Sequence, residues 1–87
     1  MADKLLILEV LGADGVLFKE ENISSINVRM QNGDLIGIRP GHTPLISLAA
    51  KGTLKYRVGE EQKTVDIDAG VLTIRRNRVR ILTTGAR

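Results

Sequence analysis

Apolar and polar residues alternate along most of this 87-residue chain. Three clear runs place their apolar residues at Ile26, Val28 and Met30, at Leu54, Tyr56 and Val58, and at Val65 and Ile67. A period of two puts all the apolar side chains of a strand on one face. Each run therefore predicts a strand with one buried face and one wet face.

Turn signals separate these runs at short intervals. Gly59-Glu60-Glu61 and Arg76-Asn77 each join two alternating segments and predict β-hairpins. No stretch of ten or more residues has a capped helical period, and the best candidate, Leu45 to Lys51, predicts at most one helical turn before Gly52. We expect residues 1–87 to form one all-β domain of eight to ten strands, arranged as a two-sheet sandwich or a flattened barrel.

The segment from Gly33 to Ile46 contains two stiff elements. Arg39-Pro40-Gly41-His42 has proline and glycine at the positions that a type II turn requires. Pro44 restricts Thr43 to an extended conformation. A loop that loses little entropy on ordering is suited to docking against a partner in one fixed shape.

Charge and composition narrow the classes of partner. The net charge is +3, with residues 1–52 at −1 and residues 53–87 at +4, because the arginines cluster at Arg75, Arg76, Arg78 and Arg80. This cluster is compatible with a solvated surface, with a protein or lipid-headgroup contact, or with nucleic-acid binding. Phe18 and Tyr56 are the only aromatic residues, so the core must be aliphatic and base stacking has little support.

The residue types needed for catalysis are scarce. The chain has no cysteine, its only histidine is His42, and the adjacent pairs Glu20-Glu21 and Glu60-Glu61 direct their side chains to opposite faces of an extended chain. No spacing suits a metal site, and no glycine-rich loop suits a phosphate. We therefore expect a non-catalytic protein without a metal or cofactor.

Several segments together carry a family resemblance. They are GDLIGIRPGHTPLISL from Gly33, then Lys51-Gly52-Thr53-Leu54, Asp68-Ala69-Gly70-Val71-Leu72-Thr73-Ile74, and Asn77-Arg78-Val79-Arg80-Ile81-Leu82. The chain resembles the N-terminal β-sandwich domain of the epsilon subunit of F-type rotary ATP synthases, which is called delta in mitochondria. The likeness extends over nearly the whole chain, and its most distinctive part is Pro-Gly-His-x-Pro-Leu.

The resemblance implies a fold and a role. It implies ten strands in two five-stranded sheets, and a non-catalytic central-stalk subunit that links gamma to the membrane c-ring and couples ion transport to ATP synthesis or hydrolysis. The implied partners are gamma and the c-ring, with the alpha and beta subunits reached indirectly, and neither nucleic acid nor membrane insertion is expected. The implied location is peripheral, on the cytoplasmic side of a bacterial-type membrane.

The resemblance also implies contact residues. Asp34 stands where the family has an acidic residue that meets the c-ring, and Arg39, Gly41 and His42 stand in the loop near the ring and gamma. The expected contact set is Asp34, Arg39, Pro40, Gly41, His42 and Pro44. The alternatives are local: Pro40, Gly41 and Pro44 shape the turn, and His42 makes a structural hydrogen bond.

The chain departs from the family pattern in several places. Asp34-Leu35-Ile36-Gly37 has one residue more than the family spacing, Arg39 occupies a position that is usually apolar or aromatic, and Arg75 to Arg78 is more basic than usual. The sequence stops at Arg87, where the family continues into a C-terminal helical hairpin, so we expect neither that hairpin nor its inhibitory effect. The alternative function is a free-standing basic β-barrel module that binds single-stranded nucleic acid.

Overall fold

The structure, a computed structural model, describes residues 5–86. These residues form eight strands and no helix, which confirms the all-β prediction. The strands are β1 (Leu6–Gly12), β2 (Gly15–Arg29), β3 (Leu35–Ile38), β4 (Leu45–Ala49), β5 (Gly52–Val58), β6 (Glu61–Ile67), β7 (Gly70–Arg75) and β8 (Arg78–Thr83). No helical turn forms within Leu45 to Lys51, where the sequence allowed at most one; β4 pairs with β7 from Leu45 to Ala49 instead.

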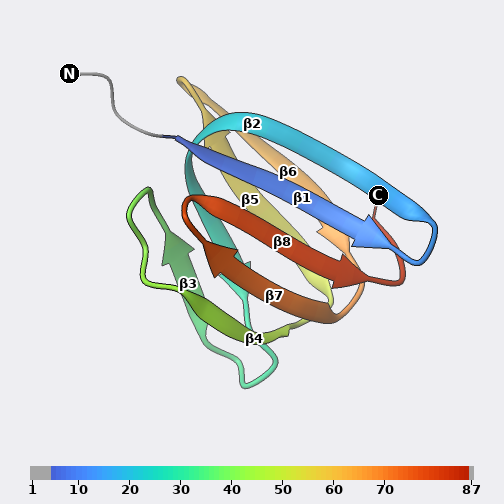
Figure 1. Cartoon of the computed structure of the whole chain (residues 1–87). Coiled ribbons are helices and arrows are strands. Elements are labelled where there is room, and N and C mark those ends of the chain that lie inside the picture. The colour runs from blue at the N-terminus through green and yellow to red at the C-terminus, as the bar shows by residue number, and fades with distance from the viewer. Residues whose placement is uncertain (1–4, 87) are drawn as a thin grey trace.

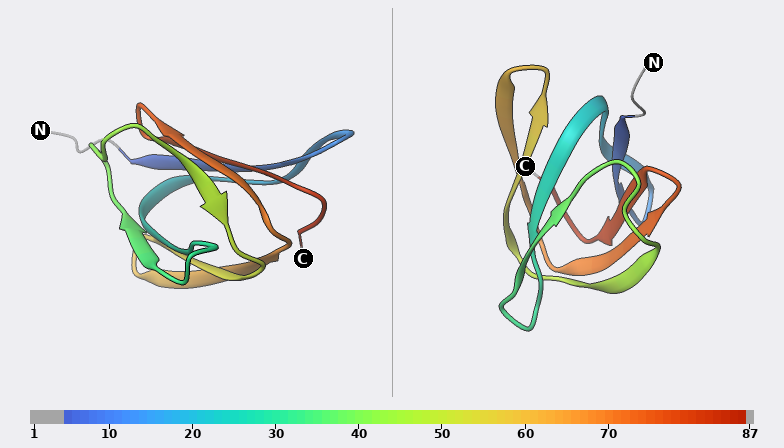
Figure 2. Two further views of the ribbon diagram at one scale, coloured as in Figure 1. Left: turned by 90° about the horizontal axis from the view of Figure 1, so that it is seen from below. Right: turned by 90° about the vertical axis from the view of Figure 1, so that its left-hand side faces the viewer.

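The strands form one hydrogen-bonded sheet rather than two separate ones. Their order is β4-β7-β8-β1-β2-β5-β6, with β3 added alongside β2. Every pair is antiparallel except β1 with β8, which bring the two ends of the domain together in parallel. The sheet folds over on itself into two facing layers (Figure 1, Figure 2). The expectation of ten strands in two five-stranded sheets therefore differs from the structure in strand number and connection.

The long strand β2 accounts for one of the two missing strands and for the connection between the layers. Its first part pairs with β1, and its second part pairs with β5 and β3. The register shifts on both sides of the changeover, where Asn22 has a φ of 60°. A bulge of this kind bends a strand and increases its twist. Because β2 belongs to both layers, a single strand replaces two that a sandwich of separate sheets would need.

Additional backbone contacts join the layers at two corners. Beyond β2, the Gln31 N–H donates to the Leu48 carbonyl at 3.0 Å, and the Ala50 N–H donates to the Arg29 carbonyl at 2.9 Å. At the other corner, the Asp68 N–H donates to the Gly85 carbonyl at 3.0 Å. These bonds satisfy polar groups near the open margins of the sheet and hold the two layers in register.

The core lies between the layers and is almost entirely aliphatic. Tyr56 is its one buried aromatic residue, and Phe18 packs edge-on against it with ring centroids 5.9 Å apart. The alternating runs of the sequence point inward as predicted. The buried apolar residues are Leu6, Leu8, Val10, Ile23, Ile26, Val28, Met30, Ile38, Ala49, Leu54, Tyr56, Val65, Ile67, Leu72, Ile74, Val79 and Ile81.

Both predicted hairpins are present. Gly59 and Glu60 connect β5 to β6, and Arg76 and Asn77 connect β7 to β8. Gly59, Arg76 and Asn77 all have positive φ, which tight hairpin turns favour because their twist matches that of the strands. The second hairpin also contacts the loop formed by residues 39–44.

Candidate partner-binding surface

The loop between β3 and β4, residues 39–44, adopts the predicted tight turn. The His42 N–H donates to the Arg39 carbonyl at 3.0 Å, and Gly41 has a φ of +86°. Both are properties of a type II turn with glycine at its third position. The prediction of a type II turn at this point is confirmed.

Asn77 holds this loop against the β7–β8 turn. Its side-chain oxygen accepts a hydrogen bond from the Gly41 N–H at 2.7 Å, across 36 positions of sequence. Its own carbonyl accepts from the Ile7 N–H at 2.9 Å. Asn77 therefore links β1, the β7–β8 turn and the 39–44 loop. The sequence indicates Asn77 as a turn residue and as the start of a family-like segment, and no local pattern indicates a contact so distant along the chain.

His42 makes a local contact. Its Nδ1 lies 2.7 Å from the Thr43 carbonyl oxygen, and because a carbonyl can only accept, this nitrogen carries the proton. The hydrogen bond agrees with the structural alternative for His42. The side chain remains partly exposed, so a contact with a partner stays a prediction.

Asp34 lies apart from the loop. It belongs to the turn before β3, where its N–H donates to the Asn32 side-chain oxygen at 2.9 Å and its carbonyl accepts from Met30 N–H at 2.7 Å. The strand β3 separates Asp34 from Arg39, a span of roughly 17 Å for five extended residues. The structure thus groups Arg39, Pro40, Gly41, His42 and Pro44 in one loop and places Asp34 at the opposite end of β3.

The outer face of the layer built from β4, β7, β8, β1 and the start of β2 carries an apolar row. The strand register places one apolar residue of each strand beside the next. All five residues are exposed or half-exposed. We call this set the apolar row; it consists of Leu48, Val71, Leu82, Leu11 and Val16.

The outer face of the other layer is polar. Outward positions along β5 and β6 include Lys55, Arg57, Thr64 and Asp66, all exposed. Leu35, on the edge strand β3, is the exception. The two outer faces of the sandwich therefore differ in chemistry, a distinction that alternation alone did not indicate.

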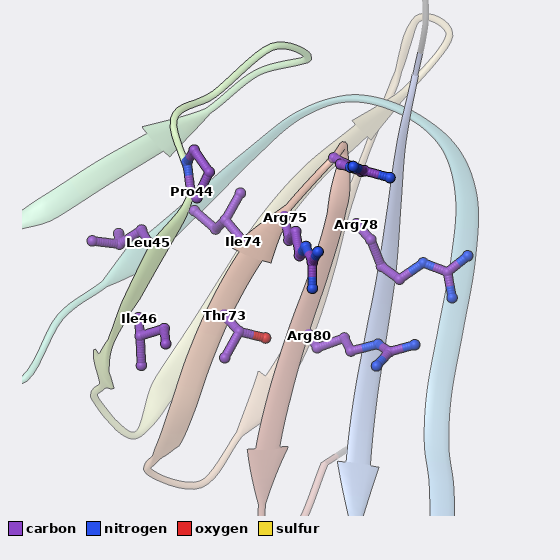
Figure 3. Close-up of a pocket in the computed structure, with 9 residues that line it drawn as sticks. Pro44, Leu45, Ile46, Thr73, Ile74, Arg75, Arg78 and Arg80 are labelled. Carbon is purple, nitrogen blue, oxygen red and sulfur yellow. The ribbon is translucent and has the colours of Figure 1, made fainter.

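A groove of about 800 Å³ crosses the first outer face next to the 39–44 loop (Figure 3). Pro44, Leu45 and Ile46 line one side along β4, and the arginine cluster lines the other along β7 and β8. The full lining is Pro44, Leu45, Ile46, Thr73, Ile74, Arg75, Arg76, Arg78 and Arg80. We call it the arginine groove.

Glu9 balances part of this charge. Arg80 Nε donates to Glu9 Oε1 at 2.9 Å, and Arg78 Nη1 lies 3.5 Å from the same oxygen. The hydrogen bond from Arg80, followed by the charges of Arg80, Arg78 and Lys19, lowers the pKa of Glu9 despite the opposing effect of its burial. Glu9 is only 9% exposed and fixes two arginines on the face.

The described residues show neither a metal-binding cluster nor a membrane-spanning helix. Within residues 5–86, no three histidine, aspartate or glutamate side chains converge in an arrangement suited to a metal ion. The same part of the chain contains no helix long and apolar enough to cross a membrane. The geometry of the described residues thus offers a rigid loop, an apolar row and a basic groove as surfaces for recognition.

Comparisons with known proteins agree with the sequence resemblance. The family described as ATP synthase, Delta/Epsilon chain, beta-sandwich domain matches residues 5–87. The ATP synthase epsilon chain of Leptospira borgpetersenii serovar Hardjo-bovis is 33% identical over 78 residues, which cover 90% of this chain and 60% of that protein. The ATP synthase epsilon chain of Solibacter usitatus is 35% identical over 77 residues, covering 88% and 56%.

A solved structure supports the fold. A chain in the cryo-EM structure of the Euglena gracilis mitochondrial ATP synthase, comprising OSCP, F1 and c-ring, superposes with a TM-score of 0.84 at 23% identity. The match covers 100% of this chain and 55% of that one. This chain therefore spans a little over half the length of the proteins it matches.

The Glu9 contacts predict a pH-dependent contribution to stability. The pKa of the Glu9 carboxyl is lower in the folded than in the unfolded state, so its ionised form stabilises the fold. This contribution is fully present above the unfolded-state pKa of about 4.3. It is lost as the pH falls below that pKa and then through the lower folded-state pKa. We expect Glu9→Gln to lower the melting temperature at pH 7, with the difference from the wild type shrinking towards pH 3. Glu60→Gln, in an exposed turn, is the control and should follow the wild-type profile. A Glu9→Gln curve parallel to the wild type from pH 7 to pH 3 would contradict this account.

Proposed function

Because the chain belongs to the family of ATP synthase delta and epsilon chain β-sandwich domains, we propose that it is a non-catalytic central-stalk subunit that joins gamma to the membrane c-ring. In this role it transmits torque and register between the ring and the stalk, coupling ion transport to ATP synthesis or hydrolysis. It lies peripherally on the cytoplasmic side of the membrane and meets the alpha and beta subunits only through gamma. The likeness to the curated ATP synthase epsilon chains supports this assignment.

The observation that carries the proposal is the chemical difference between the two outer faces. The apolar row crosses five strands, and Leu48 and Leu82 within it are each about half exposed. A contiguous exposed apolar surface on a small domain marks an interaction site, because leaving it in water is unfavourable. We therefore assign the face of β4, β7, β8 and β1 to gamma, and leave the polar face of β5 and β6 to solvent.

The 39–44 loop suits the ring-facing end of the domain. Its type II turn, its two prolines and the Asn77 hydrogen bond restrict its conformation on both sides of Gly41. A coupling element transmits displacement only if it deforms less than its partners. We assign the loop residues Arg39, Pro40, Gly41, His42 and Pro44 to the ring contact. Asp34 lies at the other end of β3, so it meets the ring only if the ring surface extends that far.

The nucleic-acid alternative has less support. Single strands are usually bound by a basic groove combined with exposed aromatic rings on which bases stack. Here Tyr56 is buried, and Phe18 packs against it rather than standing free on the arginine-bearing face. The structure offers a basic groove without a stacking platform.

The gamma face is tested with matched leucine variants. Leu82 is 55% exposed in the apolar row, and Leu35 is 58% exposed on β3 outside it. We expect the chain to form a one-to-one complex with its own organism's gamma subunit in native mass spectrometry. Fully burying an exposed leucine contributes about 1.5–3 kcal/mol, and Leu82 has only about half of its surface left to bury. Leu82→Ser should therefore weaken binding by roughly three- to tenfold, and Leu35→Ser should have little effect.

Thermal melting should show that both leucine variants are folded at the assay temperature. Equal affinities for gamma in the two variants, or a larger loss in Leu35→Ser, would assign gamma to another surface. Absence of any complex with the folded wild-type chain would reject the stalk role itself.

Variants of Asn77 test whether the stiffness of the 39–44 loop is required for coupling. Asn77→Gly retains access to positive φ but removes the acceptor of the Gly41 N–H, whereas Asn77→Asp retains an acceptor at the same place. In reassembled ATP synthase we expect Asn77→Gly to reduce the number of ions pumped per ATP hydrolysed, and Asn77→Asp to stay close to the wild type. Amide hydrogen exchange at Gly41 should be faster in Asn77→Gly. Faster exchange with full coupling would show that loop stiffness is not required.

A further inference from the structure

The arginine groove carries more positive charge than the described part of the chain neutralises. Arg78 and Arg80 share one carboxylate, Glu9. Arg75 and Arg76, both exposed, make no ion pair with any acidic side chain within residues 5–86. Four guanidinium groups around one groove thus have a single carboxylate between them, which leaves an excess of three positive charges.

The β7–β8 hairpin also has two features that are unfavourable for its own stability. Arg75 and Arg78 are directly paired across the strands, and like charges in that position repel. Arg76 occupies a turn position with a φ of 52°, where asparagine or glycine is preferred. Departures from locally favourable chemistry concentrate at functional sites. Repulsion between Arg75 and Arg78 would be relieved by an anionic group bound between them.

We infer that the arginine groove binds an acidic segment of the gamma subunit, one that presents aspartate or glutamate side chains beside apolar residues. This inference rests on the proposed function and specifies the chemistry of the gamma surface. Guanidinium groups bind carboxylates through paired hydrogen bonds, and the side of the groove formed by Pro44 and Ile46 accepts apolar groups. The occupant is therefore mixed in character, with carboxylates towards β8 and apolar side chains towards β4.

The position of the groove favours the partner that covers the apolar row. The register places Leu48 and Val71 side by side in the apolar row. Two residues further towards the β7–β8 turn, Ile46 lies beside Thr73. The Arg75–Arg78 pair comes next, at the turn itself. Since outward side chains stand roughly perpendicular to a sheet, the arginines of β7 and β8 project from the same face as the row. One protein surface can cover both, with its carboxylates nearer the 39–44 loop.

A bilayer and a nucleic acid fit less well. Arg75, Arg78 and Arg80 line a groove together with Pro44 and Ile46, and a protein segment can enter such a groove more readily than a flat headgroup surface can (Figure 3). Nucleic acid lacks a stacking partner there, because the groove lining contains no aromatic residue. Both remain outcomes that the experiment below can register.

The test compares two double variants in which arginine or lysine is replaced by glutamate, so that both variants change the net charge by the same amount. The first, Arg75→Glu/Arg76→Glu, reverses the charge of the two arginines that make no ion pair. The second, Lys55→Glu/Arg57→Glu, is the control and makes the same change in net charge on the polar outer face. Calorimetric titration with gamma at low salt should show about a tenfold loss of affinity for the first variant and little change for the second. The loss should shrink at high salt, because screening weakens the contribution of exposed charges. Thermal melting of both variants verifies that they are folded.

The outcomes separate this inference from the proposed function. Equal affinities for gamma in the two charge-reversal variants, with Leu82→Ser still impaired, would overturn the acidic-segment inference and leave the stalk role standing. A folded wild-type chain that fails to bind gamma would overturn both. Parallel titrations use vesicles of three parts phosphatidylcholine to one part phosphatidylglycerol and a twenty-nucleotide oligo-dT. If Arg75→Glu/Arg76→Glu weakened binding to either of these but not to gamma, the inference would also be overturned.

Discussion

The bend in β2 is the constraint on which the rest of this fold depends. Fifteen residues of continuous strand pass from one layer to the other, with Asn22 at positive φ where the partner changes from β1 to β5. Without that bend, the eight strands would extend as one open sheet with an exposed apolar face. With it, the sheet closes over a core that is wholly aliphatic apart from Tyr56. Because the core has little aromatic bulk, its stability comes from many small, closely packed side chains.

Closure of one sheet also determines what each outer face can do. The layer containing the parallel pair β1 and β8 brings the beginning and end of the domain side by side, and its outward residues form the apolar row and the arginine groove. The second layer presents polar side chains to solvent. The surfaces that we propose for recognition therefore lie on one face and on the adjoining loop, which Asn77 connects to the same β7–β8 hairpin that bears the arginines. The proposed gamma face and the 39–44 loop are thus connected through that hairpin.

Much of this architecture could be predicted from the sequence, for physical reasons. Period-two alternation marked most inward-facing residues, and proline with glycine specified the type II turn at residues 39–42. The strand β4 could not be predicted, because an apolar run in which Ile46 and Leu48 face solvent shows no clear alternation. The alternation allowed eight to ten strands, and the structure has eight where the family resemblance implied ten. A bulge such as the one at Asn22 has no distinctive sequence signature, so one bent strand cannot be told from two. The Asn77 bond and the cross-strand apolar row depend on register between distant segments, which local patterns do not encode.

Whether gamma covers the face formed by β4, β7, β8 and β1 can be measured directly, because the chain contains no cysteine. A single cysteine placed at Leu82 or at Thr64, labelled with a photoreactive maleimide, would be incorporated into assembled ATP synthase, irradiated and analysed by mass spectrometry. Both positions are exposed, on opposite outer faces of the sandwich. We predict that Leu82→Cys crosslinks to gamma and that Thr64→Cys does not. Crosslinking to gamma from position 64 alone would contradict the assignment of the apolar face as the docking surface.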